Sequence, residues 1–548
     1  MDRHRDSLAR ALAYGLPLAF LALFFLYPLA AIVDRGLRGE GDAPLDVLTD
    51  PVTWGVVWFT VWQALASTAL TIAVALPAAY VLGRYRFRGR GLVSALVVVP
   101  FVLPTVVVAL AFLAILPGSH DRGWAPILIA HAFFNVAVVV RIVGTAWASL
   151  DPRLGEAAAT LGASPAERFR EITAPLLSPA LASAAAIVFL FSFTSFGVVL
   201  ILGGPRYATI EAEVYNQAVR LFDLRAAAVL SLIQLACVAA TVWVAMRLER
   251  HVTLASPGDE RDTLRPPRTV RDKLLVGATL GLLAVFLGVP IVVLVEQSLT
   301  LGDGYGFDAY EALTRPTSAL LVEPWEAIAN SVVYAAAATA IAVVVGGLAA
   351  FVVVGGSNGH APVSDAGSDT RTRPLRTRVL DGLVLLPLGA SAVMLGLGFL
   401  IAFDTAPFAF RGEPWLVPVA QALVAIPFVV RIVAPALRSI DPHQREAAAL
   451  LGASPSRVRR EIDLPIVSRG LAVAAGFAFA ISLGEFGATV FLARPDNPTL
   501  PVAIFRFLGR PGELNVAQAY ALAVVLMTVT VVAVLLVDRV RVRRGGWA

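Results

Sequence analysis

The feature that most constrains this chain is a series of twelve apolar runs, each about twenty residues long. A helix rises ~1.5 Å per residue, so about twenty apolar residues cross the ~30 Å hydrocarbon core of a bilayer. The runs are continuous, whereas the strands of a membrane β-barrel alternate between apolar and polar residues. We therefore predict an all-α polytopic membrane protein with transmembrane helices at 11–33, 56–82, 91–117, 124–148, 176–203, 226–247, 272–299, 327–354, 379–404, 413–438, 467–493 and 517–537.

The composition excludes several other classes of protein. Charged residues make up 15% of the chain, against ~25% in an average soluble domain. The single cysteine, Cys237, excludes a disulfide framework within the chain. The single lysine, Lys273, does not follow the glycines of a P-loop, so we expect no ATPase activity in this chain. The net charge of +5 suits basic inner loops, and no nucleic-acid partner is expected.

A polar segment recurs between the apolar runs. The segments that begin at Glu156 and at Glu446 lie 290 positions apart and match at 13 of 20 positions. The same offset relates Phe196-Gly197 to Phe486-Gly487. Six runs per half in the same orientation indicate two parallel repeats, related by an axis along the membrane normal. The predicted organisation is a first repeat at 1–250 with a loop at 149–175, a connector at 251–271, and a second repeat at 272–548 with a loop at 439–465.

Arginine placement predicts the orientation of the chain in the membrane. Arginine clusters lie at 84–90, 371–378 and 541–544, and positive charge is retained on the cytoplasmic side. One assignment satisfies all three clusters. It places both termini, the connector and both copies of the loop in the cytoplasm of a multi-pass cell-membrane protein.

Each loop copy carries signals for a helix-turn-helix. In the first copy Asp151-Pro152 begins a helix and Gly162 ends it. Ser164 and Glu167 form a capping box that starts a second helix, and the prolines Pro175 and Pro465 are expected to end this second helix in the two copies. A narrow face of the first helix carries residues at helical spacing, namely Leu154, Ala157, Ala158 and Leu161.

Two interpretations of this loop are possible. A capped loop that only closes the bundle is the commoner case for a single copy. Loops normally diverge in sequence, whereas here two copies within one chain have remained alike. The duplication therefore favours a paired docking element over a simple inter-helix connection.

The loop is similar to the signature loop of the integral membrane subunits of bacterial and archaeal ABC importers. The second copy carries Glu446-Ala447-Ala448, Gly452, Ile462, Leu464 and Pro465, and the first departs once, at Ala174. This resemblance implies that each loop seats in a cleft on a cytoplasmic ATPase subunit, with two copies per complex. It implies that Glu156 and Glu446 meet basic residues of the ATPase. It also implies that small residues permit close seating, namely Ala157, Ala158, Gly162, Ala447, Ala448 and Gly452. ATP and Mg would be used by the partner, and no cofactor is expected in this chain.

The double-length chain resembles the thiamine permeases in particular. The segments that carry this likeness are Leu128–Asn135, Ser195–Glu211 and Ser482–Gly487. The resemblance implies import of thiamine or its phosphates, delivered by an extracytoplasmic binding protein, with alternating access between the halves. A ferric-iron importer is the runner-up, because the Glu-Phe-Gly form at Glu485 also occurs there, whereas thiamine permeases carry Asp. An ion-coupled secondary transporter using Glu485 is a remote alternative, and no residue constellation indicates an enzyme.

Four polar residues inside the spans are candidates for the translocation pathway: Glu485, Ser195, His131 and Asn135. Intramembrane acids are costly and often mark a pathway, but Glu485 could equally cap local backbone. His131 and Asn135 lie one helical turn apart, and hydrogen bonding between helices is favoured over substrate contact. A lone His and Asn do not form a metal site. A cationic aromatic substrate could also contact phenylalanine rings in the spans, although packing is the commoner role of such rings. These phenylalanines are Phe191, Phe193, Phe196, Phe479 and Phe486.

Overall fold

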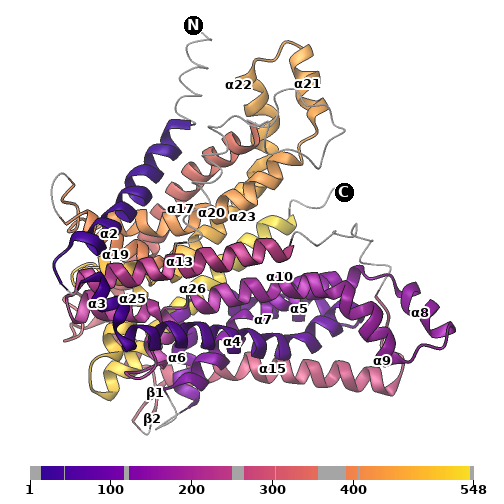
Figure 1. The fold of residues 1–548 in the computed structure, drawn as a ribbon, viewed down its shortest axis with the longest axis horizontal. Coiled ribbons are helices and arrows are strands. Elements are labelled where there is room, and N and C mark those ends of the chain that lie inside the picture. The colour runs from indigo at the N-terminus through magenta and orange to yellow at the C-terminus, as the bar shows by residue number, and fades with distance from the viewer. Residues whose placement is uncertain are drawn as a thin grey trace.

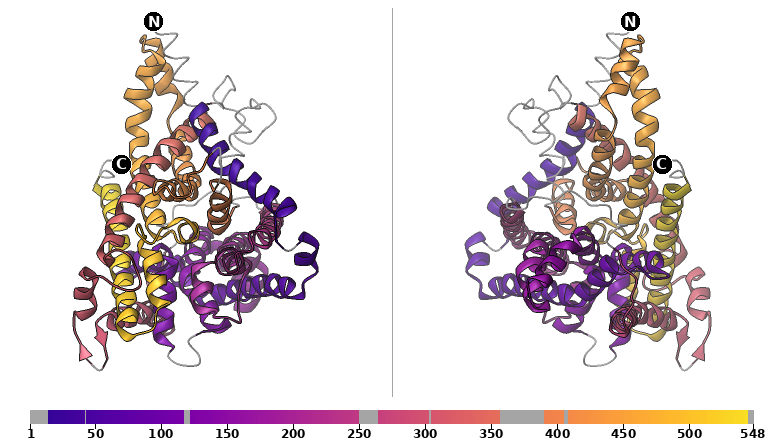
Figure 2. Two further views of the ribbon diagram at one scale, coloured as in Figure 1. Left: turned by 90° about the vertical axis from the view of Figure 1, so that its left-hand side faces the viewer. Right: turned by 90° about the vertical axis from the view of Figure 1, so that its right-hand side faces the viewer.

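The computed structural model describes residues 14–41, 43–116, 122–249, 264–302, 304–355, 390–404 and 408–543. Ten helices in this part of the chain are long and apolar enough to cross a membrane. The predicted class, an almost entirely helical polytopic membrane protein, is confirmed. Figures 1 and 2 show long helices running together through the molecule, with a small two-stranded hairpin at its edge.

The first half contains η1 (Ala22–Leu26), α2 (Tyr27–Arg38), α3 (Pro44–Thr49), α4 (Pro51–Arg84), α5 (Arg90–Val102), α6 (Thr105–Ile115), α7 (Trp124–Ser149), α8 (Pro152–Thr160), α9 (Pro165–Arg168), η2 (Phe169–Thr173), α10 (Ala174–Phe193), α11 (Gly197–Leu202), α12 (Ile210–Tyr215), η3 (Asn216–Arg220) and α13 (Leu224–Glu249). The second half contains α15 (Val270–Ser298), β1 (Thr300–Leu301), β2 (Gly304–Tyr305), α16 (Asp308–Glu311), η4 (Ala312–Thr314), α17 (Pro324–Gly355), α19 (Ala392–Ala402), α20 (Leu416–Arg438), α21 (Pro442–Leu450), α22 (Pro455–Val458), η6 (Arg459–Asp463), α23 (Leu464–Gly484), α24 (Thr489–Leu492), α25 (Leu500–Leu508) and α26 (Glu513–Arg543).

The third predicted span, 91–117, is not one straight helix. It consists of α5 and α6, which meet at an angle of 99°. Pro104 follows the break, and Leu103 before it has an extended backbone. A proline lacks the N–H that would continue the helix and disfavours helical geometry in the residue before it. The predicted span at 91–117 is thus a pair of helices with a sharp bend, which the sequence pattern did not indicate.

Two other predicted spans begin earlier and end earlier than expected. The runs 176–203 and 467–493 belong to helices at Pro165–Phe193 and Arg460–Gly484, and each is followed by a separate short helix, α11 or α24. The ninth run, 379–404, lies partly outside the described residues. In its described part the structure has one short helix, α19. Most of the connector predicted at 251–271 also lies outside them.

The two prolines expected to end the loop helices do not end them. Pro175 and Pro465 lie in the first turns of α10 and α23, and the helix passes through them from the loop into the membrane span. A five-residue π-helical turn, η2 or η6, stands before each proline. This wider turn changes the hydrogen-bond register in the stretch where proline cannot donate a backbone bond. The prediction from proline alone was wrong for this reason.

The halves repeat one packing scheme and exchange their first helices. Helices α4, α7 and α10 pack on one another, as do α17, α20 and α23 in the second half. The first span of each half lies against the other half as well. The helix ending in α2 packs on α19, and α15 packs on α6 and α4. These contacts join the two halves.

Small residues allow the closest helix contacts in the core. At Gly83 on α4 an added Cβ would lie 2.7 Å from the carbonyl oxygen of Gly144 and 3.1 Å from Cβ of Trp147, both on α7. Membrane helices commonly use such small residues where their backbones approach. Because the nearest contacting atom is a backbone oxygen, a larger residue at Gly83 requires α4 and α7 to move apart.

We predict that Gly83→Ala lowers the stability of the protein by about 1–3 kcal/mol through overpacking. The measurement is thermal unfolding of the purified protein in detergent. The matched control is Gly277→Ala on α15, where no atom lies within 4 Å of an added Cβ. That variant should be neutral, or more stable by up to about 1 kcal/mol, because alanine favours helix. Equal losses in the two variants would contradict the packing argument.

Candidate functional site

The first copy of the duplicated loop is an elbow of two short helices held by local hydrogen bonds. The Asp151 carboxylate accepts the N–H of Arg153 at 2.9 Å and caps α8. Gly162 ends the helix with φ +87°, a conformation that glycine adopts without strain. The predicted capping box is present, since Ser164 N–H donates to Glu167 at 2.7 Å and Glu167 N–H donates to Ser164 Oγ at 3.3 Å.

The second copy has the same shape with different capping. Asp441 accepts the N–H of His443 at 2.9 Å to begin α21, and Gly452 ends it with φ +81°. Arg457 stands where the first copy has Glu167, so the glutamate half of the capping box has no counterpart here. Arg457 instead pairs with Glu461 at 3.0 Å.

Both elbows project from the helical bundle and expose apolar tips. Figure 1 shows α8 and α21 as separate protrusions beyond the long helices. No residue of α8 is buried. Leu161 is 88% exposed, and Leu450 and Leu451 are 90% and 88% exposed. Large apolar side chains this exposed on two matching protrusions indicate surfaces that a partner covers.

The predicted docking residues lie on these protrusions. Glu156 and Glu446 are exposed, and within the described part of the chain neither carboxylate forms a hydrogen bond. The small residues beside them have matching exposure in the two copies, exposed at Ala157 and Ala447 and intermediate at Ala158 and Ala448. Each elbow thus presents a shallow surface with one free acid next to it.

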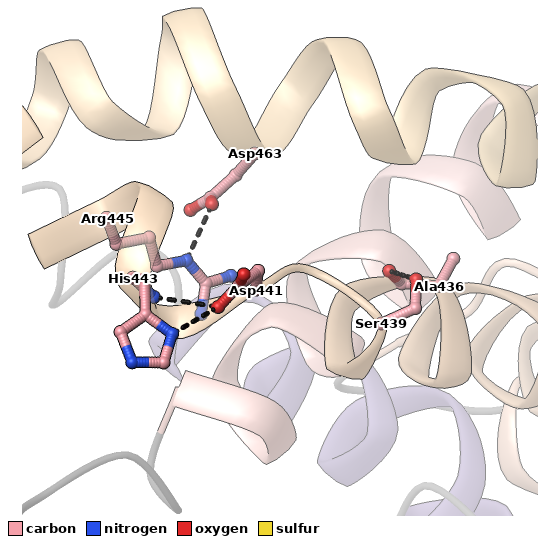
Figure 3. A network of polar contacts seen from close by, with 6 residues as sticks. All are labelled: Ala436, Ser439, Asp441, His443, Arg445 and Asp463. Atoms are coloured by element: carbon pink, nitrogen blue, oxygen red, sulfur yellow. Dashed lines mark hydrogen bonds and ion pairs between the residues drawn. The ribbon is translucent and has the colours of Figure 1, made fainter. Parts of the chain in front are cut away.

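The two elbows are braced differently. In the second copy Arg445 Nε donates to Asp463 Oδ1 at 2.8 Å, joining α21 to the end of η6 (Figure 3). The equivalent positions in the first copy are Gly155 and Thr173, so that ion pair has no counterpart there. Arg168 instead donates to the carbonyl oxygen of Gly155 at 3.4 Å. The second elbow therefore has a charged brace and the first a longer bond to backbone.

A histidine lies at the first turn of the second elbow only. His443 Nδ1 lies 2.8 Å from Asp441 Oδ1 (Figure 3). This hydrogen bond, together with the charges of Asp441 and Glu446, raises the pKa of His443 above its ordinary value. The equivalent residue of the first elbow is Arg153. Protonation of His443 makes the two elbows more alike in charge.

Glu485 serves the local backbone. Its Oε1 accepts the N–H of Ala488 at 2.7 Å and its Oε2 accepts the N–H of Thr489 at 3.0 Å, which caps α24. Ser195 occupies the equivalent position 290 residues earlier and is also buried. Both residues precede a short helix next to the contact between the halves, where the Phe196 and Phe486 rings stack.

His131 and Asn135 lie apart from that contact, inside the first half. They are buried on α7 where it packs on α4 and α10. His131 Nδ1 lies 3.0 Å from Ser67 Oγ, and Asn135 Nδ2 donates to Ser192 Oγ at 3.5 Å. These bonds link three helices of one half, an arrangement in keeping with the interhelical interpretation.

One buried acid was missed as a candidate. Glu211 on α12 is 2% exposed and accepts a hydrogen bond from Gln234 Nε2 at 2.6 Å. It faces Ser391 and Met394 of α19 in the other half. The signal in the sequence was an acid that follows Ala208-Thr209-Ile210, but only the fold places it between the halves.

Comparison with known proteins identifies the family. The model of the binding-protein-dependent transport system inner membrane component matches the chain twice, at residues 75–253 and 366–544. The chain belongs to this family. The two matches fall on the two halves, and each includes one elbow.

Individual relatives extend this result over the whole chain. The thiamine transport system permease protein of Brucella suis is 30% identical over 98% of both chains. Its Escherichia coli K12 counterpart is 27% identical over 88% of both. The sulfate transport system permease protein of Salmonella typhimurium is 33% identical over 41% of this chain and 87% of its own length. The chain is thus an ABC transporter permease of the thiamine permease type.

We predict that Asp463→Asn loosens the second elbow. Loss of a hydrogen bond between charged groups costs about 1–2 kcal/mol for a pair this little exposed, so amide exchange across 442–450 should quicken about five- to thirtyfold. Hydrogen exchange with mass spectrometry measures this change. Arg457→Gln, which breaks the exposed ion pair of the same elbow, should change exchange less than about threefold. No difference between the variants would refute the brace.

Proposed function

We propose that this chain is the transmembrane subunit of an ATP-driven importer for thiamine or its phosphates. It accepts substrate from an extracytoplasmic binding protein and works with two copies of a cytoplasmic ATPase. The observation that carries the coupling role is the pair of exposed elbows. Each has a cap at both ends of its first helix, an apolar tip and a free glutamate, and each lies in the family's signature segment.

The proposed coupling is mechanical. In the proposed orientation both termini lie in the cytoplasm, as the elbows do. The second helix of each elbow, α9 or α22, continues through a π-helical turn into a membrane span, α10 or α23. A displacement of α8 or α21 by the ATPase is passed across the turn at Gly162 or Gly452 to this helix and so into the bundle. ATP hydrolysis belongs to the partner, and this chain converts its motion into alternating access.

The cargo proposal rests on the relatives that cover the whole chain. Relatives named for thiamine transport match both halves of this chain, whereas the relative named for sulfate matches only 41% of it. One half of the fold is thus compatible with different cargoes. The likeness over both halves is what supports thiamine.

We predict that Glu156→Arg and Glu446→Arg together abolish assembly with the ATPase. Each reversal replaces attraction by repulsion at a surface that the partner desolvates, and should weaken binding at least about tenfold. Co-purification of the ATPase with the tagged permease measures this effect. The control is Glu311→Arg on exposed α16, the same charge change remote from the elbows. Assembly unchanged in the double variant would exclude these glutamates from docking.

Uptake by proteoliposomes tests the cargo. Proteoliposomes that contain the permease, its ATPase and its binding protein should accumulate labelled thiamine. They should do so only when ATP is present on the side of the membrane that carries the ATPase. Ferric iron and sulfate should not compete. Thiamine uptake by the permease alone under a proton gradient would instead support a secondary transporter, and ATP-driven uptake of iron without thiamine would replace the cargo.

A further inference from the structure

Four aromatic rings from two pairs of equivalent positions meet between the halves. Phe196 and Phe486 occupy equivalent positions, as do Tyr215 and Phe505. The rings of the first pair stack with centroids 5.2 Å apart and planes 28° apart. The rings of the second pair lie 6.1 Å apart. Within each half the rings contact at 5.8 Å and 5.5 Å, so the cluster is nearly symmetric.

Contact between equivalent positions locates the axis of pseudo-symmetry. Two positions related by a two-fold rotation are separated by twice their distance from the axis. Each ring therefore lies at about half the observed separation from it. Parallel repeats are related by an axis along the membrane normal, and such transporters bind and pass substrate at the interface between repeats. The cluster consequently lies across the route between the halves.

The cluster is closed and tightly fitted. Phe196, Tyr215 and Phe486 are buried, and Phe505 is partly buried. A Cβ at Gly197 would lie 2.6 Å from Thr105 Oγ1 and 3.4 Å from Cδ1 of Phe486. A larger residue at Gly197 would clash with Thr105, and it would also touch the Phe486 ring. The rings thus form a seal in this arrangement of the halves.

The four rings suit a flat aromatic molecule. Aromatic faces bind planar rings by offset stacking. The guanidinium carbon of Arg220 lies 5.9 Å from the centre of the Tyr215 ring, so a planar group already lies near one of these faces.

We propose that substrate passes between Phe196 and Phe486, and that these rings with Tyr215 and Phe505 bind it by stacking on its planar aromatic ring. The inference rests on the proposed import of such a cargo and adds the residues that contact it. Separation of the halves parts the stacked rings and exposes their faces. A planar solute then replaces the ring-to-ring contact that closes the route.

The test replaces aromatic faces without emptying the site. Phe196→Leu and Phe486→Leu each keep an apolar side chain but remove the stacking surface, and thiamine uptake per ATP hydrolysed should fall about five- to tenfold. The matched control is Phe399→Leu. Phe399 packs on Phe403 with centroids also 5.2 Å apart, and it is buried in a separate aromatic cluster that includes Phe24. Its uptake ratio should stay within about twofold of the unmodified protein. Equal ratios in all three variants would overturn the proposal.

A second measurement does not depend on the cargo. In a Cys237→Ala background, Phe196→Cys with Phe486→Cys allows a short thiol crosslinker to lock the halves. Crosslinking should lower ATP turnover of the assembled transporter with its binding protein at least about fivefold, and cleavage of the linker should restore it. The same crosslink between Phe399→Cys and Phe403→Cys should change turnover little. Unchanged ATP turnover after crosslinking of the Phe196→Cys, Phe486→Cys variant would overturn the proposal. Absence of ATP-driven thiamine uptake in the unmodified protein would refute only the cargo.

Discussion

The structure depends on one constraint, that backbone N–H and C=O groups removed from water must find partners within the chain. Long helices satisfy it throughout the spans. Where the helices break between the halves, side chains take over. Glu485 binds the free N–H groups at the start of α24, Thr60 Oγ1 accepts the N–H of Ile210 at 3.0 Å, and Ser331 Oγ accepts that of Leu500 at 2.6 Å. These bonds permit the short helices that carry the ring cluster.

The two halves are most alike in the membrane and differ in the support of their elbows. The same three-helix packing and the same short helices occur in both. Only the second elbow has the Arg445–Asp463 ion pair. Because both halves belong to one chain, the two elbows always occur together and can differ in their support. The protein thus has two elbows of similar shape, one of them held by a charged pair.

Local features of the site were predictable from a few neighbouring residues. The caps at Asp151 and Ser164 and the left-handed turn at Gly162 depend only on chemistry within four positions, and all three are present. Proline was less reliable as a signal. Pro104 bends its span by 99°, whereas Pro175 continues a helix because a π-helical turn precedes it. Whether a proline breaks a helix depends on surroundings that a residue pattern does not contain.

The amino-acid sequence by itself determined the membrane class, the duplication and the form of both elbows. Those properties follow from the hydrophobicity of continuous runs and from contacts along a single turn. Only the tertiary structure decided what residues distant in the chain do together. It assigned Glu485 to the start of α24, placed Glu211 opposite α19, and stacked Phe196 on Phe486. The last contact joins positions 290 residues apart, which meet only because two packed bundles share an axis.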